Sequence, residues 1–123
     1  MSPYDPLKHG PKRIVGPGFH EQVHKLVGTV PPGSVTTYGD IGAALGSSTV
    51  ARHVGYAMAA LPEGHGVPWW RVVRADGSLP DSHHDTARQA YLEEGTALRP
   101  SGAVDIRAAF WQPPPVPPSP DVA

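Results

Sequence analysis

Cysteine is absent from all 123 residues of the chain. Its absence excludes disulfide scaffolds, thiolate zinc sites, iron–sulfur clusters and every mechanism that uses a cysteine nucleophile. No apolar run approaches the roughly 20 residues of a membrane-spanning helix, and the first residues, MSPYDPLKHG, contain no hydrophobic signal core. We therefore expect a cytoplasmic protein that does not bind membranes.

The chain also lacks a strong net charge. It has 10 Lys and Arg against 11 Asp and Glu, a net charge of −1, which is not the basic balance usual for a nucleic-acid-binding domain. The distribution is uneven, because seven Lys and Arg stand against five Asp and Glu through residue 80, and three against six beyond it. Any basic face is therefore expected in the first two-thirds of the chain.

Proline and glycine, in contrast, are abundant, with 16 and 14 residues. A chain of this length has room for one domain, which we place at residues 19–111. Residues 1–18 are expected to form an extended lead-in. Residues 112–123, QPPPVPPSPDVA, are expected to form a Pro-rich disordered tail that is either a solvated end or a peptide ligand.

The domain begins with two helical signals. Apolar residues recur at helical spacing from Phe19 to Val30, where Pro31-Pro32-Gly33 ends the pattern. After a short extended segment at 35–37, Thr37-Tyr38-Gly39-Asp40 has the form of a capping box that opens a second helix.

Gly46 fits the end of that helix, and Ser47-Ser48 can cap a third one that runs through Met58. Two short helices joined by a tight turn form a helix-turn-helix. The Asp76-Gly77 dipeptide after Val72-Val73 favours a β-hairpin, and a last helix is expected over 87–92. The expected fold is mainly α with a small β-hairpin, a winged helix-turn-helix.

Two patterns suggest metal binding. His20-Glu21-x-x-His24 matches the H-E-x-x-H motif of zinc hydrolases, but no third ligand follows, and an amphipathic helix explains the same residues. The pair His83-His84 lies beside Asp85, where an exposed polar loop is the simpler interpretation. We expect no metal and no other cofactor.

The segments VPPGSVTTYGDIGAALG, STVARHVGYAM and VPWWRVV together resemble the DNA-binding domain of the O6-alkylguanine-DNA alkyltransferases, from Val30 to about Gly77. The active-site loop of that family reads Pro-Cys-His-Arg-Val-Val. Trp69 therefore stands at the position of the alkyl-accepting cysteine, and Trp70 at that of the proton-relaying histidine. This substitution is typical of the alkyltransferase-like branch, and it implies a protein with no catalytic residue and no transferase activity.

The resemblance also implies a set of DNA contacts. Arg52 matches the arginine finger that fills the space left by a flipped base, and Tyr38 matches the tyrosine that rotates the target phosphate. Met58 matches a residue that packs on the flipped base, and the carbonyl groups of Trp69 and Val72 match those that bind the guanine amine. The implied DNA and lesion contacts are Tyr38, Ala51, Arg52, Gly55, Met58, Val67, Pro68, Trp69, Arg71 and Val72.

Ala51 and Gly55 match small residues that let the helix approach the minor groove. His53 and Tyr56 depart from the family because they are larger than the usual residues beside the arginine finger. Leu61 replaces an asparagine that braces the loop. Residues 80–85 do not align, and Ser82 is the nearest candidate there for a selectivity residue.

The implied function is non-enzymatic recognition of O6-alkylguanine in double-stranded DNA by base flipping into a Trp-lined pocket. The resemblance further implies that the lesion passes to nucleotide excision repair, with UvrA or an equivalent protein as partner, and that the protein is nucleoid-associated when bound. We expect a monomer. The alternatives are a winged-helix transcription regulator that binds undamaged DNA and, third, a metal-dependent hydrolase.

Overall fold

A computed structural model describes residues 15, 16, 18–62, 64–79 and 84–116. The elements, in chain order, are α2 (Phe19–Val27), β1 (Thr36–Thr37), α3 (Tyr38–Ala44), the 3₁₀ turn η1 (Ser48–Val50), α4 (Ala51–Ala59), the 3₁₀ turn η2 (Trp69–Arg71), β2 (Val72–Val73), α5 (His84–Glu94) and α6 (Ile106–Ala109). The mainly helical fold with a small sheet confirms the predicted class. None of the helices in the described part of the chain is long and apolar enough to cross a membrane.

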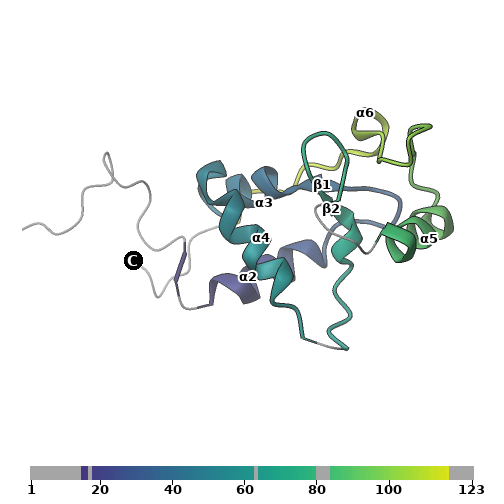
Figure 1. The fold of residues 1–123 in the computed structure, drawn as a ribbon. Coiled ribbons are helices and arrows are strands. Elements are labelled where there is room, and N and C mark those ends of the chain that lie inside the picture. The colour runs from purple at the N-terminus through teal and green to yellow at the C-terminus, as the bar shows by residue number, and fades with distance from the viewer. Residues whose placement is uncertain (1–14, 17, 63, 80–83, 117–123) are drawn as a thin grey trace, which may run out of the picture.

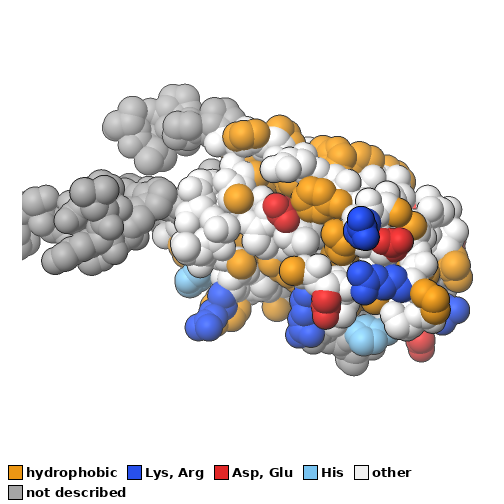
Figure 2. Space-filling model, turned by 90° about the horizontal axis from the view of Figure 1, so that it is seen from above, with side chains coloured by type: hydrophobic (Ala, Val, Ile, Leu, Met, Phe, Trp, Pro, Cys, Tyr) orange, Lys and Arg blue, Asp and Glu red, His pale blue; other side chains and the backbone are white. Residues whose placement is uncertain are grey.

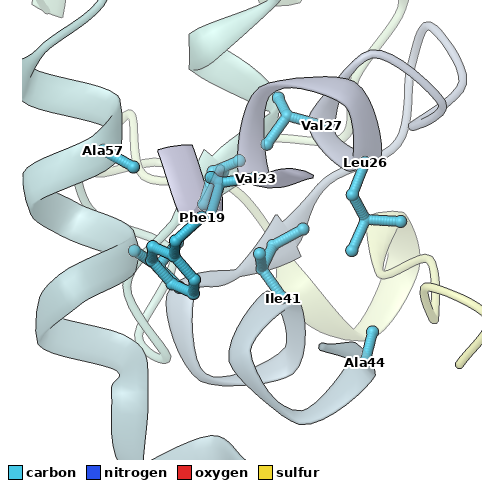
Figure 3. Packing of buried hydrophobic residues seen from close by; sticks show 9 residues of the cluster. Phe19, Val23, Leu26, Val27, Ile41, Ala44 and Ala57 are labelled. Atoms are coloured by element: carbon cyan, nitrogen blue, oxygen red, sulfur yellow. The ribbon is translucent and has the colours of Figure 1, made fainter. Parts of the chain in front are cut away.

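Helices α2, α3 and α4 pack together on one side of the molecule (Figure 1). The apolar face predicted for the first helix is buried, with Phe19, Val23 and Val27 at 2% exposure or less. Ile41 from α3 and Ala57 from α4 complete this first core (Figure 3). The burial of one helical face in each case is what fixes the relative positions of the three helices.

The predicted caps are present. The Thr37 hydroxyl accepts a 3.1 Å hydrogen bond from the Asp40 backbone N–H, and the Asp40 carboxylate accepts one from that hydroxyl, so the start of α3 is fixed by local chemistry. Gly46 follows α3 with a φ of 133°. The Ser47 hydroxyl accepts from Thr49 N–H at the start of η1, which leads directly into α4. The helix-turn-helix is thereby confirmed.

The predicted β-hairpin is wrong. β2 pairs with β1 in parallel, with Thr36 opposite Val72 and Thr37 opposite Val73. A tight turn does form at Asp76-Gly77, closed by hydrogen bonds from Arg74 N–H to the Ser78 carbonyl and from Gly77 N–H to the Arg74 carbonyl. The chain beyond Gly77 does not return along β2, because the Gly77 carbonyl accepts a 3.0 Å hydrogen bond from Val104 N–H instead.

A second core lies beside this sheet and joins β2 to the C-terminal third of the chain. Val73, Val104 and Tyr91 of α5 are buried in it, together with Ala109 of α6. Val35 N–H donates to the Ala109 carbonyl and Trp111 N–H to the Val35 carbonyl. The two cores thus meet at the short β1–β2 pair, which lies between the helical groups in Figure 1.

Residues 112–116, predicted to open a disordered tail, are instead packed on the domain. Pro113 is buried, and Val116 packs on the first core. The Val116 N–H donates a 2.7 Å hydrogen bond to the Ala44 carbonyl, which lies at the end of α3 and has no partner within that helix. Residues 112–116 therefore belong to the folded domain. The rest of the predicted tail, and the predicted lead-in up to residue 14, lie outside the described residues.

Candidate functional site

Helix α4 presents one face to the core and the opposite face to solvent. Val54 and Ala57 are fully buried, whereas Arg52 is exposed. Ala51 and Met58 are half-buried at the border between the two faces. The structure thus leaves the predicted arginine finger free to meet a partner outside the domain.

Gly55 also lies at this outer surface of α4. A Cβ atom built at this position would meet no atom within 4 Å, so internal packing does not require glycine there. A glycine inside a helix costs about 0.5–1 kcal/mol of stability relative to alanine. Packing within the fold therefore gives no reason for glycine at this position.

The segment Pro68–Val72 carries the two tryptophans. Pro68 is buried, and η2 holds Trp69 and Trp70 with their ring centroids 5.7 Å apart at an angle of 83°. Both rings pack on the second core. The Arg71 N–H donates to the Pro68 carbonyl, and Val72 enters the buried strand β2. The loop is consequently tied into the fold at both ends.

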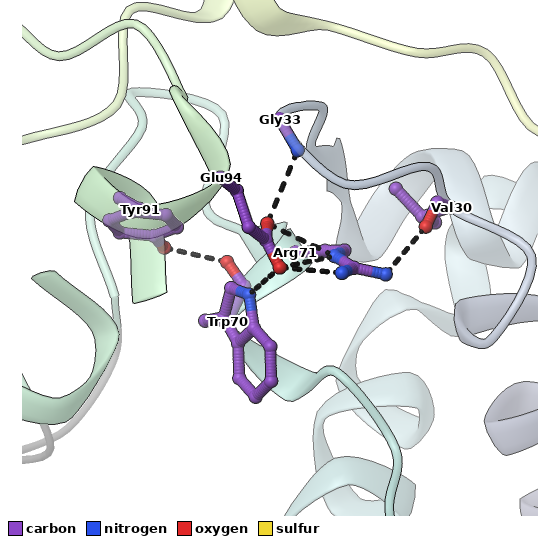
Figure 4. A network of polar contacts seen from close by, with 6 residues as sticks. All are labelled: Val30, Gly33, Trp70, Arg71, Tyr91 and Glu94. Atoms are coloured by element: carbon purple, nitrogen blue, oxygen red, sulfur yellow. Dashed lines mark hydrogen bonds and ion pairs between the residues drawn. The ribbon is translucent and has the colours of Figure 1, made fainter. Parts of the chain in front are cut away.

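Glu94, at the end of α5, holds this loop from inside (Figure 4). Its carboxylate accepts hydrogen bonds from Trp70 Nε1 at 3.0 Å and from Gly33 N–H at 3.2 Å. The guanidinium of Arg71 pairs with it through Nε at 3.2 Å and Nη2 at 2.5 Å. Three donor groups from two distant segments therefore converge on one carboxylate.

Two further hydrogen bonds complete the network of Glu94, Trp70, Arg71 and Tyr91, which we call the Glu94 brace. Arg71 Nη1 donates a 2.9 Å hydrogen bond to the Val30 carbonyl, and the Tyr91 hydroxyl donates one of 2.6 Å to the Trp70 carbonyl. The Arg71 guanidinium carbon also lies 5.6 Å from the centroid of the Trp70 ring. The backbone and the side chain of Trp70 are thus both anchored to α5.

The electrostatics of the brace favour an ionised Glu94. Burial alone would raise the pKa of this carboxyl group, but hydrogen bonds from Arg71, Gly33 and Trp70, together with the Arg71 charge, lower the pKa below its ordinary value. Burial raises the pKa of the Tyr91 hydroxyl, which therefore remains a hydrogen-bond donor. The brace keeps one fixed pattern of donors and acceptors around neutral pH.

Sequence reasoning missed Glu94 and Tyr91 as parts of the site. Tyr91 lies within the helix expected over 87–92 and Glu94 just beyond it, but neither position indicates a contact with the tryptophan loop. Their partners lie 23 and 21 residues away in the chain, and no local spacing reveals a contact of that kind.

Arg71 does not lie where the family resemblance implies, as a contact to DNA. Its side chain is only 13% exposed, and its guanidinium is committed to Glu94 and Val30. It therefore braces the loop instead of presenting its charge to a ligand. The side chain of Val72 is fully buried as well, so only its backbone could touch a ligand.

The remaining predicted contacts divide between the two cores. Tyr38, Met58 and Val67 are half-buried and pack on the first core, whereas Trp69 packs on the second. The residues that line a cavity of about 390 Å³ include Leu79, His84, Arg88, Tyr91 and Ser101. None of the predicted contact residues lines this cavity, and Ser82 lies outside the described residues.

Charged side chains are unevenly spread over the face seen in Figure 2. The upper third of that view has only apolar and neutral groups, and the Lys and Arg side chains lie below it with a few carboxylates among them. Arg71 is turned inward, so its charge is withdrawn from the protein surface.

The H-E-x-x-H pattern has a structural explanation. His24 Nε2 lies 2.7 Å from the Ala57 carbonyl oxygen, to which it must donate, and this bond joins α2 to α4. Within the described ranges, no group of three or more His, Asp or Glu side chains could hold a metal ion. His83, part of the second pattern, lies outside those ranges.

The sequence of this chain is similar to that of a known protein family. Residues 18–95 match the family described as 6-O-methylguanine DNA methyltransferase, DNA binding domain. The chain belongs to this family. The match covers α2 to α5 and ends one residue beyond Glu94, so it spans both α4 and the loop that Glu94 holds.

Individual relatives are similar to this chain over 50% to 76% of its length. A DNA base-flipping protein of Escherichia coli K12 is 40% identical over 95 residues, which are 76% of this chain and 74% of that protein. Alkyltransferase-like protein 1 of Schizosaccharomyces pombe is 44% identical over 62 residues, 50% of this chain and 56% of that protein. The predicted resemblance to alkyltransferase-like proteins is thereby confirmed.

A solved structure of a relative matches the fold as well. It is S. pombe Atl1 in complex with damaged DNA containing O6-carboxymethylguanine, with a TM-score of 0.71 and 27% identity. The match covers 80% of this chain and 99% of that chain. The arrangement of helices and sheet is therefore that of an alkyltransferase-like DNA-binding domain.

Proposed function

We propose that this protein recognises O6-alkylguanine in double-stranded DNA by flipping the modified base into a pocket walled by Trp69, and that it does not transfer the alkyl group. The observation that carries the proposal is the tryptophan pair Trp69-Trp70 in the loop where the transferases have cysteine and histidine, in a chain that has no cysteine elsewhere. The similarity to a DNA base-flipping protein and to an alkyltransferase-like protein supports it.

The chemistry of the loop supports binding without reaction. Alkyl transfer from a guanine oxygen needs a readily deprotonated nucleophile, and an indole is not one. An indole nitrogen is also a donor only, and that of Trp70 is already bonded to Glu94. Trp70 therefore cannot take a proton from a neighbour, so both the nucleophile and its base are absent from the loop.

The energetics of flipping favour a damaged base. Unstacking and unpairing a nucleotide costs a few kcal/mol, and less for a base that already pairs poorly. O6-alkylation removes the N1 proton that guanine donates to cytosine, which lowers this cost. Arg52, exposed on α4, is planar and charged, so it can fill the vacated space and pair with the orphaned base.

A protein that binds damage without repairing it must pass the lesion on. We propose that the bound and distorted DNA is handed to nucleotide excision repair, with UvrA or an equivalent damage-recognition protein as the partner. The protein would act as a cytoplasmic, nucleoid-associated monomer. A pull-down of UvrA with lesion duplex, with and without the protein, tests this step, and recovery that does not depend on the protein would contradict it.

Paired titrations test the recognition itself. A duplex with one O6-methylguanine and the same duplex undamaged are titrated at fixed salt by fluorescence anisotropy. We expect the lesion to raise affinity strongly, and Arg52→Ala to remove most of that gain. Arg107→Ala is the matched control, because Arg107 is an exposed arginine of α6, and its loss should leave the ratio of the two affinities unchanged.

Two results would contradict the proposal. Equal affinity of the unmodified protein for both duplexes would remove lesion recognition, and preference for one undamaged sequence over others would favour a transcription regulator. Incubation with DNA methylated by a radiolabelled group tests the absence of transfer. Label bound covalently to the protein would show that the alkyl group is transferred after all.

A further inference from the structure

Tyr56 lies on the same outer stripe of α4 as Arg52. The two residues are four positions apart, so in a helix they differ by about 40° in direction and by about 6 Å along the axis. Val54 and Ala57, which mark the opposite face, are fully buried. A partner that lies along this helix at Arg52 therefore also comes close to Tyr56.

Tyr56 is presented to solvent beside the ring of His53. Its side chain is 56% exposed, although a tyrosine ring is large and apolar enough to be buried at a favourable free energy. The His53 ring lies against it edge-to-face, with a centroid separation of 5.6 Å and an interplanar angle of 90°. This neighbour one turn earlier restricts the rotamers of Tyr56 before any partner binds.

The surface next to Tyr56 is open. Gly55 has no atom within 4 Å of the place where a Cβ would be, and Ala59, one turn further along the helix, is small and exposed. A flat partner can therefore reach the helix backbone beside the ring. The stripe has one cation at its start, one aromatic ring a turn later, and bare backbone between them.

We propose that Tyr56 is a second DNA-contacting residue of α4, which packs its ring against the sugars and base edges of the minor groove nearly two base steps from the flipped nucleotide. The proposal rests on the proposed function, because it needs Arg52 to face the base stack. The separation of about 6 Å along the helix corresponds to nearly two steps of about 3.4 Å. Apolar side chains inserted at such steps widen and bend the duplex.

The contact concerns the duplex and not the lesion. Sugars and base edges two steps away are the same in damaged and undamaged DNA, so Tyr56 should add affinity for both. It should also add to the bend, because a wedge holds the groove open. Discrimination between the two duplexes then remains a property of Arg52 and the pocket at Trp69.

Binding and bending measurements on three variants test the proposal. Tyr56→Ala removes the ring, Tyr56→Phe keeps the ring without the hydroxyl, and Leu92→Ala removes an exposed apolar side chain of α5 that is 64% exposed. Each variant is titrated with the lesion and the undamaged duplex, and the bend is measured by energy transfer between dyes at the duplex ends. Thermal unfolding of each variant verifies that it is folded.

We expect Tyr56→Ala to weaken binding to both duplexes by about fivefold or more, with an unchanged ratio between them and a smaller bend. Tyr56→Phe and Leu92→Ala should behave as the unmodified protein. Unchanged or tighter binding by Tyr56→Ala would overturn the proposal, since the ring would then be neutral or would hold the helix away from the DNA. A loss confined to the lesion duplex would also overturn it.

Failure of the proposed function gives a different result. In that case the unmodified protein binds both duplexes equally, whatever Tyr56→Ala does. Failure of this inference alone leaves the lesion preference of the unmodified protein intact.

Discussion

The indole N–H of Trp70 donates a 3.0 Å hydrogen bond to the carboxylate of Glu94. This bond joins the loop of the two tryptophans to the last turn of α5, and Arg71 bonds the same carboxylate from the next position in the chain. The indole nitrogen can only donate, so this contact fixes the side chain of Trp70 against α5 in one orientation.

Loss of the Glu94 carboxylate should destabilise the protein. Glu94→Ala leaves the guanidinium of Arg71, 13% exposed, without its counter-charge, which costs about 2–4 kcal/mol. The free energy of unfolding from urea titration measures this loss. Glu93→Ala is the control, because its side chain is exposed at the adjacent position of the same helix, and a similar loss there would contradict the assignment of the brace to Glu94.

The free energy of unfolding should decrease in acid because the Glu94 carboxylate becomes protonated. The pKa of Glu94 is lowered in the folded protein, so the unfolded state takes up a proton first as the pH falls. The stability that this group contributes is complete above its unfolded pKa of about 4.3 and is lost as the pH falls through the lower folded value.

Glu94→Gln tests this dependence, because glutamine cannot titrate. The unfolding free energy of the variant, measured between pH 6 and pH 3, should fall less steeply than that of the unmodified protein. Glu93→Gln should retain the original slope. Identical slopes for Glu94→Gln and the unmodified protein would show that another carboxyl group causes the acid loss.

Two glycines should respond to alanine in opposite ways. At Gly42 a Cβ would lie 2.9 Å from the Ser47 carbonyl oxygen and 3.1 Å from Val50 Cγ2, so Gly42→Ala must push the turn of the helix-turn-helix apart and lower stability. At Gly55 the space is open. Gly55→Ala should raise the unfolding free energy by up to about 1 kcal/mol.

The same Gly55→Ala variant should bind DNA more weakly, because the added methyl group keeps the α4 backbone from the minor groove. Thermal unfolding and anisotropy titration on one preparation measure both effects. A variant that is more stable and binds DNA as before would contradict the prediction that contact with DNA favours glycine at position 55.

The segment after Trp111 should contribute to stability. Val116 packs on the first core, and its N–H binds the Ala44 carbonyl at 2.7 Å. Val116→Ala removes part of that packing and should lower the unfolding free energy by about 1 kcal/mol. Gln112→Ala, at an exposed position of the same segment, should have no effect, and equal values for the two variants would show that the packing is unimportant.

Some features of this protein follow from the sequence alone because their causes are local. The capping box of Thr37 and Asp40 acts over three residues, and the helical spacing from Phe19 to Val27 fixes which face is buried. The absence of cysteine is likewise a matter of sequence, and it excludes thiol chemistry before any coordinates are considered.

Other features were decided only by the tertiary structure, because their partners are far apart in the chain. The turn at Gly77 is local and was predicted, but β2 pairs with Thr36 and Thr37, more than 30 residues earlier, instead of forming a hairpin. Glu94 likewise meets Arg71 and Gly33 across 23 and 61 residues. Contacts at such separations depend on which surfaces the whole chain buries together, and periodicity within a short window carries no information about them.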